Sequence, residues 1–239
     1  MSTATRPAAG LSPDDLRALA TRAGRDLEGA HPADVLRWAR EVFDHDLVLA
    51  SSMGDEVLVD IAARAVPGID VMFLDTGYHF AETIGTRDYY ADFTDVHLRT
   101  VLPLATVAEQ DAEHGPRLHE RNPDLCCALR KVEPLERGLA PYTAWVTGMR
   151  REDAPTRSDI TVVGWDAKRS KVKLNPLAAW TQDDLDAYVA EHHVVLNPLR
   201  ELGYASIGCA PCTRAVAPGE DPRAGRWAGT NKTECGLHT

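Results

Sequence analysis

The chain has no run of eighteen or more apolar residues, so nothing in it predicts a membrane-spanning helix. Its first residues, MSTATRPAAG, lack the basic and then apolar pattern of a secretory signal, and we therefore expect a cytoplasmic protein with no membrane partner. The chain also has no excess of positive charge, because it contains 36 acidic and 26 basic residues and its formal net charge is -10. This balance argues against nucleic acid as a partner, although a local basic patch could still bind a small anion.

Cysteine is scarce, and its number is odd. In a reducing compartment, five cysteines are more often ligands or nucleophiles than members of disulfides. Four of them form two tight groups, Cys126 with Cys127 and Cys209 with Cys212. Cys235 is left over, close to the C-terminal residue Thr239.

Alternating helical and extended patterns predict an α/β fold with a mostly parallel, twisted sheet flanked by helices. Helices are expected at 12–29, from about Ala33, at 57–65, at 78–90 and at 181–193, and strands at 46–51, 70–75, 95–101, 142–149 and 160–167. From about Ala215 the composition turns to Pro, Gly, Ala and charge, which is typical of a loop or a mobile tail. We expect one domain over residues 1–214 and a tail over 215–239, and the oligomeric state stays open, homo-oligomer included.

Three loops follow predicted strands: SSMGDE (51–56), LDTGYH (74–79) and TGMRRED (147–153). Ligands of open parallel sheets bind beyond the carboxyl ends of the strands. Gly54, Gly77 and Gly148 would let a ligand approach the backbone there, and a glycine at each of three strand ends favours a binding site over ordinary turns.

The four grouped cysteines are suited to a zinc ion or an iron–sulfur cluster. Zinc sites usually separate the ligands of each half by two to four residues, whereas Cys126 and Cys127 are adjacent and could each bind a different iron. The spacing therefore favours a cluster over zinc, and buried structural cysteines are the least favoured interpretation. Lys131, four residues after Cys127 on an expected helix, would share its face and offset the negative charge of such a cluster.

Two more features indicate anion binding and nucleophilic chemistry near the end of the chain. Arg223 and Arg226 are three residues apart, close enough for both guanidiniums to grip one sulfate or phosphate. Cys235 lies in a small, polar, Gly-containing segment, so it suits a nucleophile better than a core residue. Lys232 and His238 flank it and could lower its pKa or hold an anion beside it.

Taken together, these residues resemble the assimilatory sulfonucleotide reductases, and within that family the iron–sulfur adenosine 5′-phosphosulfate (APS) reductases. The resemblance covers most of the chain. It is carried by Cys126-Cys127 with Cys209-Ala-Pro-Cys212, by LDTGYHF and TGMRR followed by PTR, and by the terminal ECGLH. It implies the fold of the adenine-nucleotide α-hydrolase group and a role in sulfate assimilation and cysteine biosynthesis.

The resemblance also implies the chemistry. The Cys235 thiolate would attack the sulfur of APS, AMP would leave, and thioredoxin would release sulfite from an S-sulfocysteine. Cys126, Cys127, Cys209 and Cys212 would bind a [4Fe-4S] cluster that positions and polarises the substrate rather than donating electrons. The residues expected to grip the phosphosulfate are Lys131, Arg223, Arg226 and His238, and those near the adenosine are Ser51, Ser52, Gly54, Leu74, Gly148 and Arg157.

Three alternatives remain open. A reductase of 3′-phosphoadenosine 5′-phosphosulfate (PAPS) generally lacks the cluster cysteines, all four of which are present here. A pyrophosphate-loop adenylating or thiolating enzyme would need a Ser-Gly-Gly-Lys type of loop, whereas SSMGDE places Asp55 and Glu56 where they would repel a pyrophosphate. A zinc-stabilised nucleotide-binding module would leave Cys235 without a role.

Overall fold

Six strands form one sheet in the order β3-β2-β1-β4-β6-β5 in the computed structural model, which describes residues 8, 10–54, 56–228, 232 and 236–237. The strands are β1 (Leu47–Ser51), β2 (Ile69–Leu74), β3 (Val96–Val101), β4 (Ala144–Val146), β5 (Val163–Asp166) and β6 (Lys171–Leu174). Neighbouring strands are parallel except for β5, which runs antiparallel to β6. The prediction of a mostly parallel sheet is confirmed.

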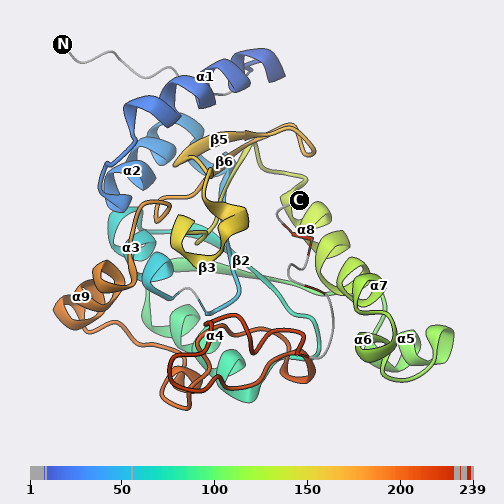
Figure 1. Ribbon diagram of the computed structural model, residues 1–239. Helices are drawn as coiled ribbons and strands as arrows, with labels where there is room; N and C mark the ends of the chain where they lie inside the picture. The colour runs from blue at the N-terminus through green and yellow to red at the C-terminus, as the bar shows by residue number, and fades with distance from the viewer. Residues whose placement is uncertain (1–7, 9, 55, 229–231, 233–235, 238–239) are drawn as a thin grey trace, which may run out of the picture.

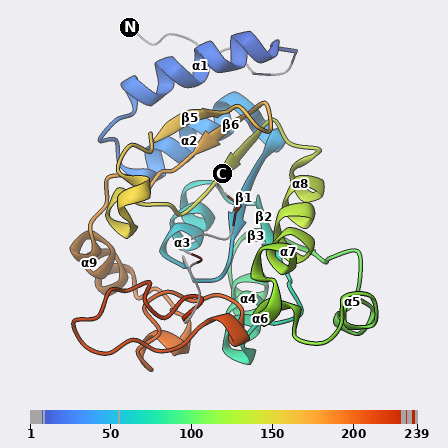
Figure 2. The same cartoon turned by 45° about the vertical axis from the view of Figure 1, so that its right-hand side comes forward.

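Helices cover both faces of the sheet, as Figure 2 shows for α3 and α8. The helices are α1 (Pro13–Asp26), α2 (Pro32–Phe43), α3 (Glu56–Ala65), α4 (Ala81–Phe93), α5 (Val107–His114), α6 (Leu118–Arg121), α7 (Pro123–Cys127), α8 (Glu133–Leu139) and α9 (Gln182–His192). The connections through α3 and α4 pack on one face, whereas α8 packs on the other. The chain therefore changes direction between β1 and β4, and this switch point is where open α/β sheets bind ligands.

The central strands are almost continuously apolar because both of their faces are buried. In β1, Leu47 and Leu49 face the larger core under α2 and α3, whereas Val48 faces a smaller core with Leu135 and Trp145. This alternation follows from the two-residue period of a strand. A run such as LVLAS can therefore pack against helices on both sides.

Strand β6 is absent from the sequence prediction, which expected a single strand over 160–167. In KVKL, Val172 and Leu174 are buried in the larger core, and two lysines alternate with them. Lys173 lies on the opposite face, with its ammonium 4.8 Å from the centre of the Trp145 ring. A lysine can cover apolar surface with its methylene chain, so a charged residue is tolerated at this position. The lysine interrupts the apolar run that would have indicated a buried strand in the sequence.

The helix that carries the adjacent cysteines is not regular. A π-helical turn, Ala128–Val132, separates α7 from α8, and the Glu133 amide donates to the carbonyl oxygen of Ala128. Pro134 follows directly and has no N–H to donate, which removes one α-helical hydrogen bond and favours the wider turn. The predicted helix is therefore present, but it is wider at the π-helical turn that contains Arg130 and Lys131.

Residues 215–228, the first part of the predicted tail, pack on the rest of the chain. Trp227 is 4% exposed, and its amide donates to the carbonyl oxygen of Cys212 at 3.0 Å. Arg226 pairs with Thr213 through an isolated antiparallel bridge. The division into 1–214 and 215–239 stays a prediction, because much of the segment beyond Trp227 lies outside the described residues.

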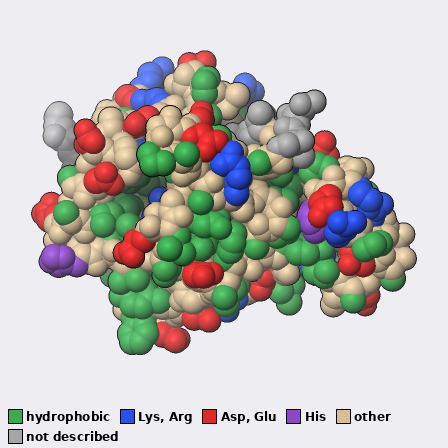
Figure 3. All heavy atoms as spheres, turned by 60° about the horizontal axis from the view of Figure 1, so that its bottom comes forward, with side chains coloured by type: hydrophobic (Ala, Val, Ile, Leu, Met, Phe, Trp, Pro, Cys, Tyr) green, Lys and Arg blue, Asp and Glu red, His purple; other side chains and the backbone are tan. Residues whose placement is uncertain are grey.

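The surface reflects the excess of acidic residues, which are spread over the face in Figure 3, while hydrophobic side chains occupy much of its centre. Among the described residues, the large apolar side chains that are exposed are Phe93, Leu102, Leu104, Val195 and Leu202. Over the described residues, the helices are too short or too polar for any of them to cross a bilayer.

Two helical glycines should respond in opposite ways to replacement by alanine. A Cβ at Gly24 in α1 would overlap the Val163 carbonyl oxygen of β5, whereas a Cβ at Gly85 in α4 would meet nothing within 4 Å. We expect Gly24→Ala to lower the free energy of unfolding by about 2 kcal/mol through overpacking. Gly85→Ala should raise it by about 0.5–1 kcal/mol. Chemical denaturation of both variants tests this, and equal effects would contradict the close approach of α1 to the sheet.

Candidate active site

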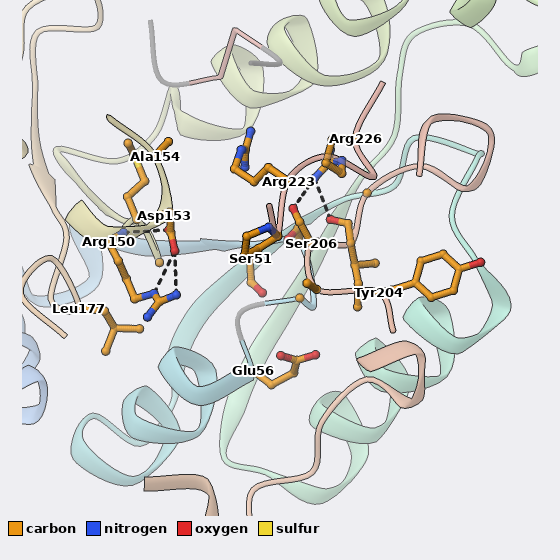
Figure 4. A pocket seen from close by; sticks show the side chains of 18 of the residues that line it. Ser51, Glu56, Arg150, Asp153, Ala154, Leu177, Tyr204, Ser206, Arg223 and Arg226 are labelled. Atoms are coloured by element: carbon orange, nitrogen blue, oxygen red, sulfur yellow. Dashed lines mark hydrogen bonds and ion pairs between the residues drawn. The ribbon is translucent and has the colours of Figure 1, made fainter. Parts of the chain in front are cut away.

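A pocket with a volume of about 800 Å³ lies at the carboxyl ends of the parallel strands. All three loops singled out in the sequence contribute to it, through residues such as Ser51, Leu74 and Gly148. Segments 204–209 and 221–227 close it from the other side. Figure 4 shows Arg150 and Asp153 on one side of the pocket and Arg223 and Arg226 on the other.

The predicted substrate residues converge on this pocket. Its lining includes Ser51, Ser52, Gly54, Leu74, Lys131, Gly148, Arg157, Arg223 and Arg226. Cys235 and His238 lie outside the described residues, so their predicted roles stay predictions. Leu237, which is described, lines the pocket and packs against the smaller core of Leu135 and Trp145.

The turn after β1 is held by the side chain of Ser51. Its hydroxyl accepts a hydrogen bond from the Met53 amide at 3.0 Å, and Met53 has a φ of 54°, which is unusual for a residue other than glycine. The side-chain Nδ2 of Asn197 donates to the Met53 carbonyl oxygen at 3.2 Å and supports this conformation. The loop thus has a fixed shape in which Ser51, Ser52 and Gly54 line the pocket.

Glu56 does not present an unpaired carboxylate to the pocket. Glu56 is fully buried, and its carboxylate accepts a hydrogen bond from the backbone N–H of Asn197 at 2.9 Å. Arg200 forms an ion pair with it at 3.2 Å. The guanidinium of Arg200 also donates to the Gly54 carbonyl oxygen. The predicted repulsion of a pyrophosphate is therefore reduced at Glu56, and Asp55 lies outside the described residues.

A second ion-pair group forms after β4. Asp153 accepts from Arg150 at 3.0 Å and from Arg157 at 3.2 Å, and both guanidiniums line the pocket. Glu152 also lines the pocket and lies 3.6 Å from Arg150, so two carboxylates balance two guanidiniums on this wall. The buried hydrogen bond from Thr147 to Asn175, at 2.6 Å, holds the strand ends from which the loop departs.

Arg226 is fixed on the opposite wall. Its Nη1 donates to the Ser206 hydroxyl at 3.2 Å and to the Ile207 carbonyl oxygen at 3.1 Å, and its guanidinium lies 4.6 Å from the centre of the Trp227 ring. Arg223 and Lys131 line the pocket as well, so three cationic side chains contribute to its lining. Such a set can bind a doubly charged anion.

Gly208 leaves the space that the Arg226 side chain occupies. A Cβ at Gly208 would overlap this guanidinium, which is the flexible end of a side chain and can move away. We expect Gly208→Ala to change the free energy of unfolding by less than about 1 kcal/mol and to lower kcat/KM by about tenfold, since Arg226 loses its position. Denaturation and steady-state kinetics measure both quantities, and an unchanged kcat/KM would argue against a role for Arg226.

The four grouped cysteines lie together beside this pocket. A second, smaller cavity is lined by Cys126, Cys127, Cys209 and Cys212 with Tyr78, His119, Pro123, Arg130, Lys131 and Pro211. All four are free thiols. Burial and the three neighbouring thiols raise the pKa of Cys126 to about 12, and burial and Cys209 raise that of Cys212 to about 11. The thiols of Cys126 and Cys212 are thus protonated until a cation compensates their charge.

Polar groups surround these thiols. The Thr76 hydroxyl lies 3.2 Å from the Cys209 sulfur, and Arg130, which is 4% exposed, donates to the Thr76 carbonyl oxygen. Within the described residues, no set of three or more His, Cys, Asp or Glu side chains has the arrangement of a site for a metal ion. Lys131 and Cys209 line both cavities, so the wall between them is shared.

Comparisons with known proteins identify the family. The model of the phosphoadenosine phosphosulfate reductase domain matches residues 46–215. This chain belongs to that family. A relative from Streptomyces coelicolor named adenosine 5′-phosphosulfate reductase is 61% identical over 94% of this chain and 95% of its own length. A relative of the same name from Mycolicibacterium smegmatis is 53% identical over the same shares.

Solved structures agree with this family fold. The crystal structure of a phosphoadenylyl-sulfate reductase from Candida auris in complex with phosphate matches with a TM-score of 0.69 and 30% identity, over 87% of this chain and 98% of that one. A mutant FMN adenylyltransferase from Candida glabrata has a TM-score of 0.57 at 12% identity, over 88% of this chain and 75% of that one, and shares the fold alone. The expected relation to adenine-nucleotide α-hydrolase folds is confirmed.

Several pocket residues were not named from the sequence. Arg150 and Asp153 belong to the TGMRRED loop, in which only Gly148 was singled out. His79 belongs to LDTGYH, and burial lowers its pKa, so its ring is neutral and its Nε2 lies 2.9 Å from the Leu74 carbonyl oxygen. Arg150, Asp153 and His79 could have been found from their position in loops that follow predicted strands. No local pattern indicated Arg200, which reaches the pocket from a distant segment of the chain.

Proposed function

We propose that this chain reduces adenosine 5′-phosphosulfate to sulfite and AMP, with thioredoxin as the reductant and Cys235 as the nucleophile. The name and high identity of the curated relatives support the reaction. The observation that carries the proposal is the shared wall of the two cavities. There Lys131 lies next to the thiols and also lines the pocket that holds Arg223 and Arg226.

The substrate would lie with its adenosine across the strand ends and its phosphosulfate among the cationic side chains. Ser51, Gly54, Leu74 and Gly148 offer close approach to the backbone for the adenosine. Arg223, Arg226 and Lys131 would bind the charged end. Leu237, two residues after Cys235 in the sequence, lines the same pocket.

The reaction is a displacement at sulfur followed by a thiol exchange. The Cys235 thiolate forms a bond to the sulfur of the sulfate, and the bond from that sulfur to the phosphate oxygen breaks, which releases AMP. The product is an S-sulfocysteine. One thiolate of thioredoxin then attacks the Cys235 sulfur and releases sulfite, and its second thiol resolves the mixed disulfide, so that the dithiol supplies both electrons.

Cys126, Cys127, Cys209 and Cys212 would hold a [4Fe-4S] cluster. The fit rests on the chemistry of four free thiols that line one cavity, with the Thr76 hydroxyl beside Cys209 and the buried guanidinium of Arg130 in the lining. When bound, the cluster would help to position and polarise the phosphosulfate through its local charge. Lys131 would offset the negative charge of the ligated thiolates and remain directed at the substrate.

The proposed function is tested by incubating anaerobically purified protein with labelled APS in the absence of reductant. Mass measurement of the C-terminal peptide should find one sulfonate on Cys235, and free AMP should appear in equal amount. Metal and sulfide analysis of the same sample should give about four irons per chain for a single [4Fe-4S] cluster. Unmodified Cys235 after AMP release would overturn the proposed intermediate.

Substrate preference is measured in the same assay. We expect kcat/KM for APS to exceed that for PAPS, following the names of the curated relatives. A preference for PAPS would move the chain toward the activity of the Candida auris neighbour. ATP consumption would favour a pyrophosphate-loop enzyme, and colourless protein with one zinc would favour a nucleotide-binding module.

A further inference from the structure

His119 enters the thiol cavity from outside the cysteine motifs. It belongs to the short helix α6, and it lines the same cavity as Cys126, Cys127, Cys209 and Cys212. In Figure 1, α6 lies beside α7 at the edge of the molecule, away from α9. The proposed function gives this side chain no role.

The two ring nitrogens of His119 have different surroundings. Nε2 lies 3.6 Å from a carboxylate oxygen of Glu120, whose side chain is 52% exposed, so this nitrogen faces outward. Nδ1 is buried, and it finds no hydrogen-bond partner among the residues that the structure describes. A buried polar atom without a partner costs about 1–3 kcal/mol. Nδ1 therefore requires a partner that the described protein atoms do not supply.

The ring is held in this orientation by its neighbours. It packs edge to face against Tyr78, with ring centres 5.3 Å apart, and the guanidinium of Arg130 lies 5.3 Å from the centre of the Tyr78 ring. Arg130 is itself fixed by hydrogen bonds to the Ala105 carbonyl oxygen at 3.2 Å and to Gln110 at 3.1 Å. His119, Tyr78 and Arg130 thus form one packed wall of the cavity.

We propose that His119 donates a hydrogen bond from Nδ1–H to a sulfur atom of the iron–sulfur cluster held by the four thiols. The inference rests on the proposed function, because it requires that cofactor. His119 is then a positioning residue that acts through the cluster. A hydrogen bond to a metal-bound sulfur withdraws electron density from it, which changes the iron–sulfur bond strength and favours the reduced form.

The test compares two variants of the holoenzyme that separate hydrogen bonding from packing. His119→Phe keeps an aromatic ring against Tyr78 and removes the nitrogen, whereas His119→Asn keeps an N–H donor near the position of Nδ1 and removes the ring. His114→Phe is the control, because His114 lies at the end of α5 and outside the cavity lining. Resonance Raman spectroscopy measures the iron–thiolate stretching frequency, and loss of the charge-transfer absorption in chelator measures cluster release.

We expect His119→Phe to raise the iron–thiolate stretching frequency and to speed cluster loss by about tenfold. His119→Asn and His114→Phe should remain close to the wild-type chain in both measurements. A wild-type spectrum for His119→Phe, or a larger change in His119→Asn than in His119→Phe, would overturn the inference in favour of packing. Wild-type protein that contains no iron and sulfide would instead overturn the proposed cofactor, so the two failures are distinguishable.

Discussion

Replacing Cys235 with serine is expected to abolish sulfite formation, lowering kcat by at least about a thousandfold. A serine hydroxyl has a far higher pKa than a thiol and cannot form the sulfur–sulfur bond that thioredoxin would attack. The four cavity thiols and the described pocket residues are unchanged in this variant. Nucleotide binding and iron content should therefore match the wild-type chain. Sulfite release is measured with labelled APS and reduced thioredoxin.

The matched control for this variant is Cys212→Ser, which removes a thiol from the cavity rather than from the C-terminal segment. We expect that change to lower iron content first and turnover as a consequence. Cys235→Ser should do the reverse and leave the iron-dependent absorption intact. Normal turnover by Cys235→Ser would remove the proposed nucleophile, whatever the state of the metal.

Lys131→Ala should lower kcat/KM for APS by about a hundredfold while iron content stays close to that of the wild-type chain. The side chain lines both cavities, so its removal takes away a positive charge next to the thiols and next to the proposed phosphosulfate position. The interaction should strengthen as negative charge develops on the departing AMP phosphate. Most of the loss is therefore expected in kcat rather than in KM. Steady-state kinetics with metal analysis of the same preparation measures both.

Two further variants identify the cause of such a loss. Lys131→Arg keeps the charge and should recover part of the activity, although a planar guanidinium does not replace a compact ammonium fully. Arg37→Ala removes one exposed positive charge from α2, outside the pocket lining, and should have wild-type kinetics. Wild-type kinetics for Lys131→Ala would contradict the proposed interaction of this lysine with the phosphosulfate.

The sequence predicted the parts of the fold that depend on local pattern. Strand β1 is an apolar run, and α9 follows the N-cap Thr181, which forms a reciprocal capping box with Asp184 three residues on. It missed β6, because Lys173 occupies a position where apolar residues normally mark a strand and covers Trp145 instead. The π turn was missed because Pro134 exerts its effect on a hydrogen bond one turn earlier.

The site was predictable where residues follow a strand or repeat a chemical type. The nine described residues of the predicted substrate set all line one pocket. For those in the loops after β1, β2 and β4, the reason is that loops at parallel strand ends meet at the same edge of the sheet. Partners that come from distant parts of the chain could not be found in this way. Arg200 pairs with Glu56 across 144 positions, and His119 reaches the thiols from a separate short helix. Neither pairing leaves a local signal.

The segment after Cys212 returns to the cysteine loop at Arg226 and Trp227. The Trp227 amide binds the Cys212 carbonyl oxygen, and Arg226, its neighbour, pairs with Thr213. Any inorganic group that orders the loop of Cys209 and Cys212 therefore also restrains the arginine that would grip the sulfate. The affinity for the cofactor and the affinity for the ligand are then linked by one coupling free energy, and thermodynamic reciprocity requires that bound nucleotide raise the equilibrium affinity for the cofactor by the same factor.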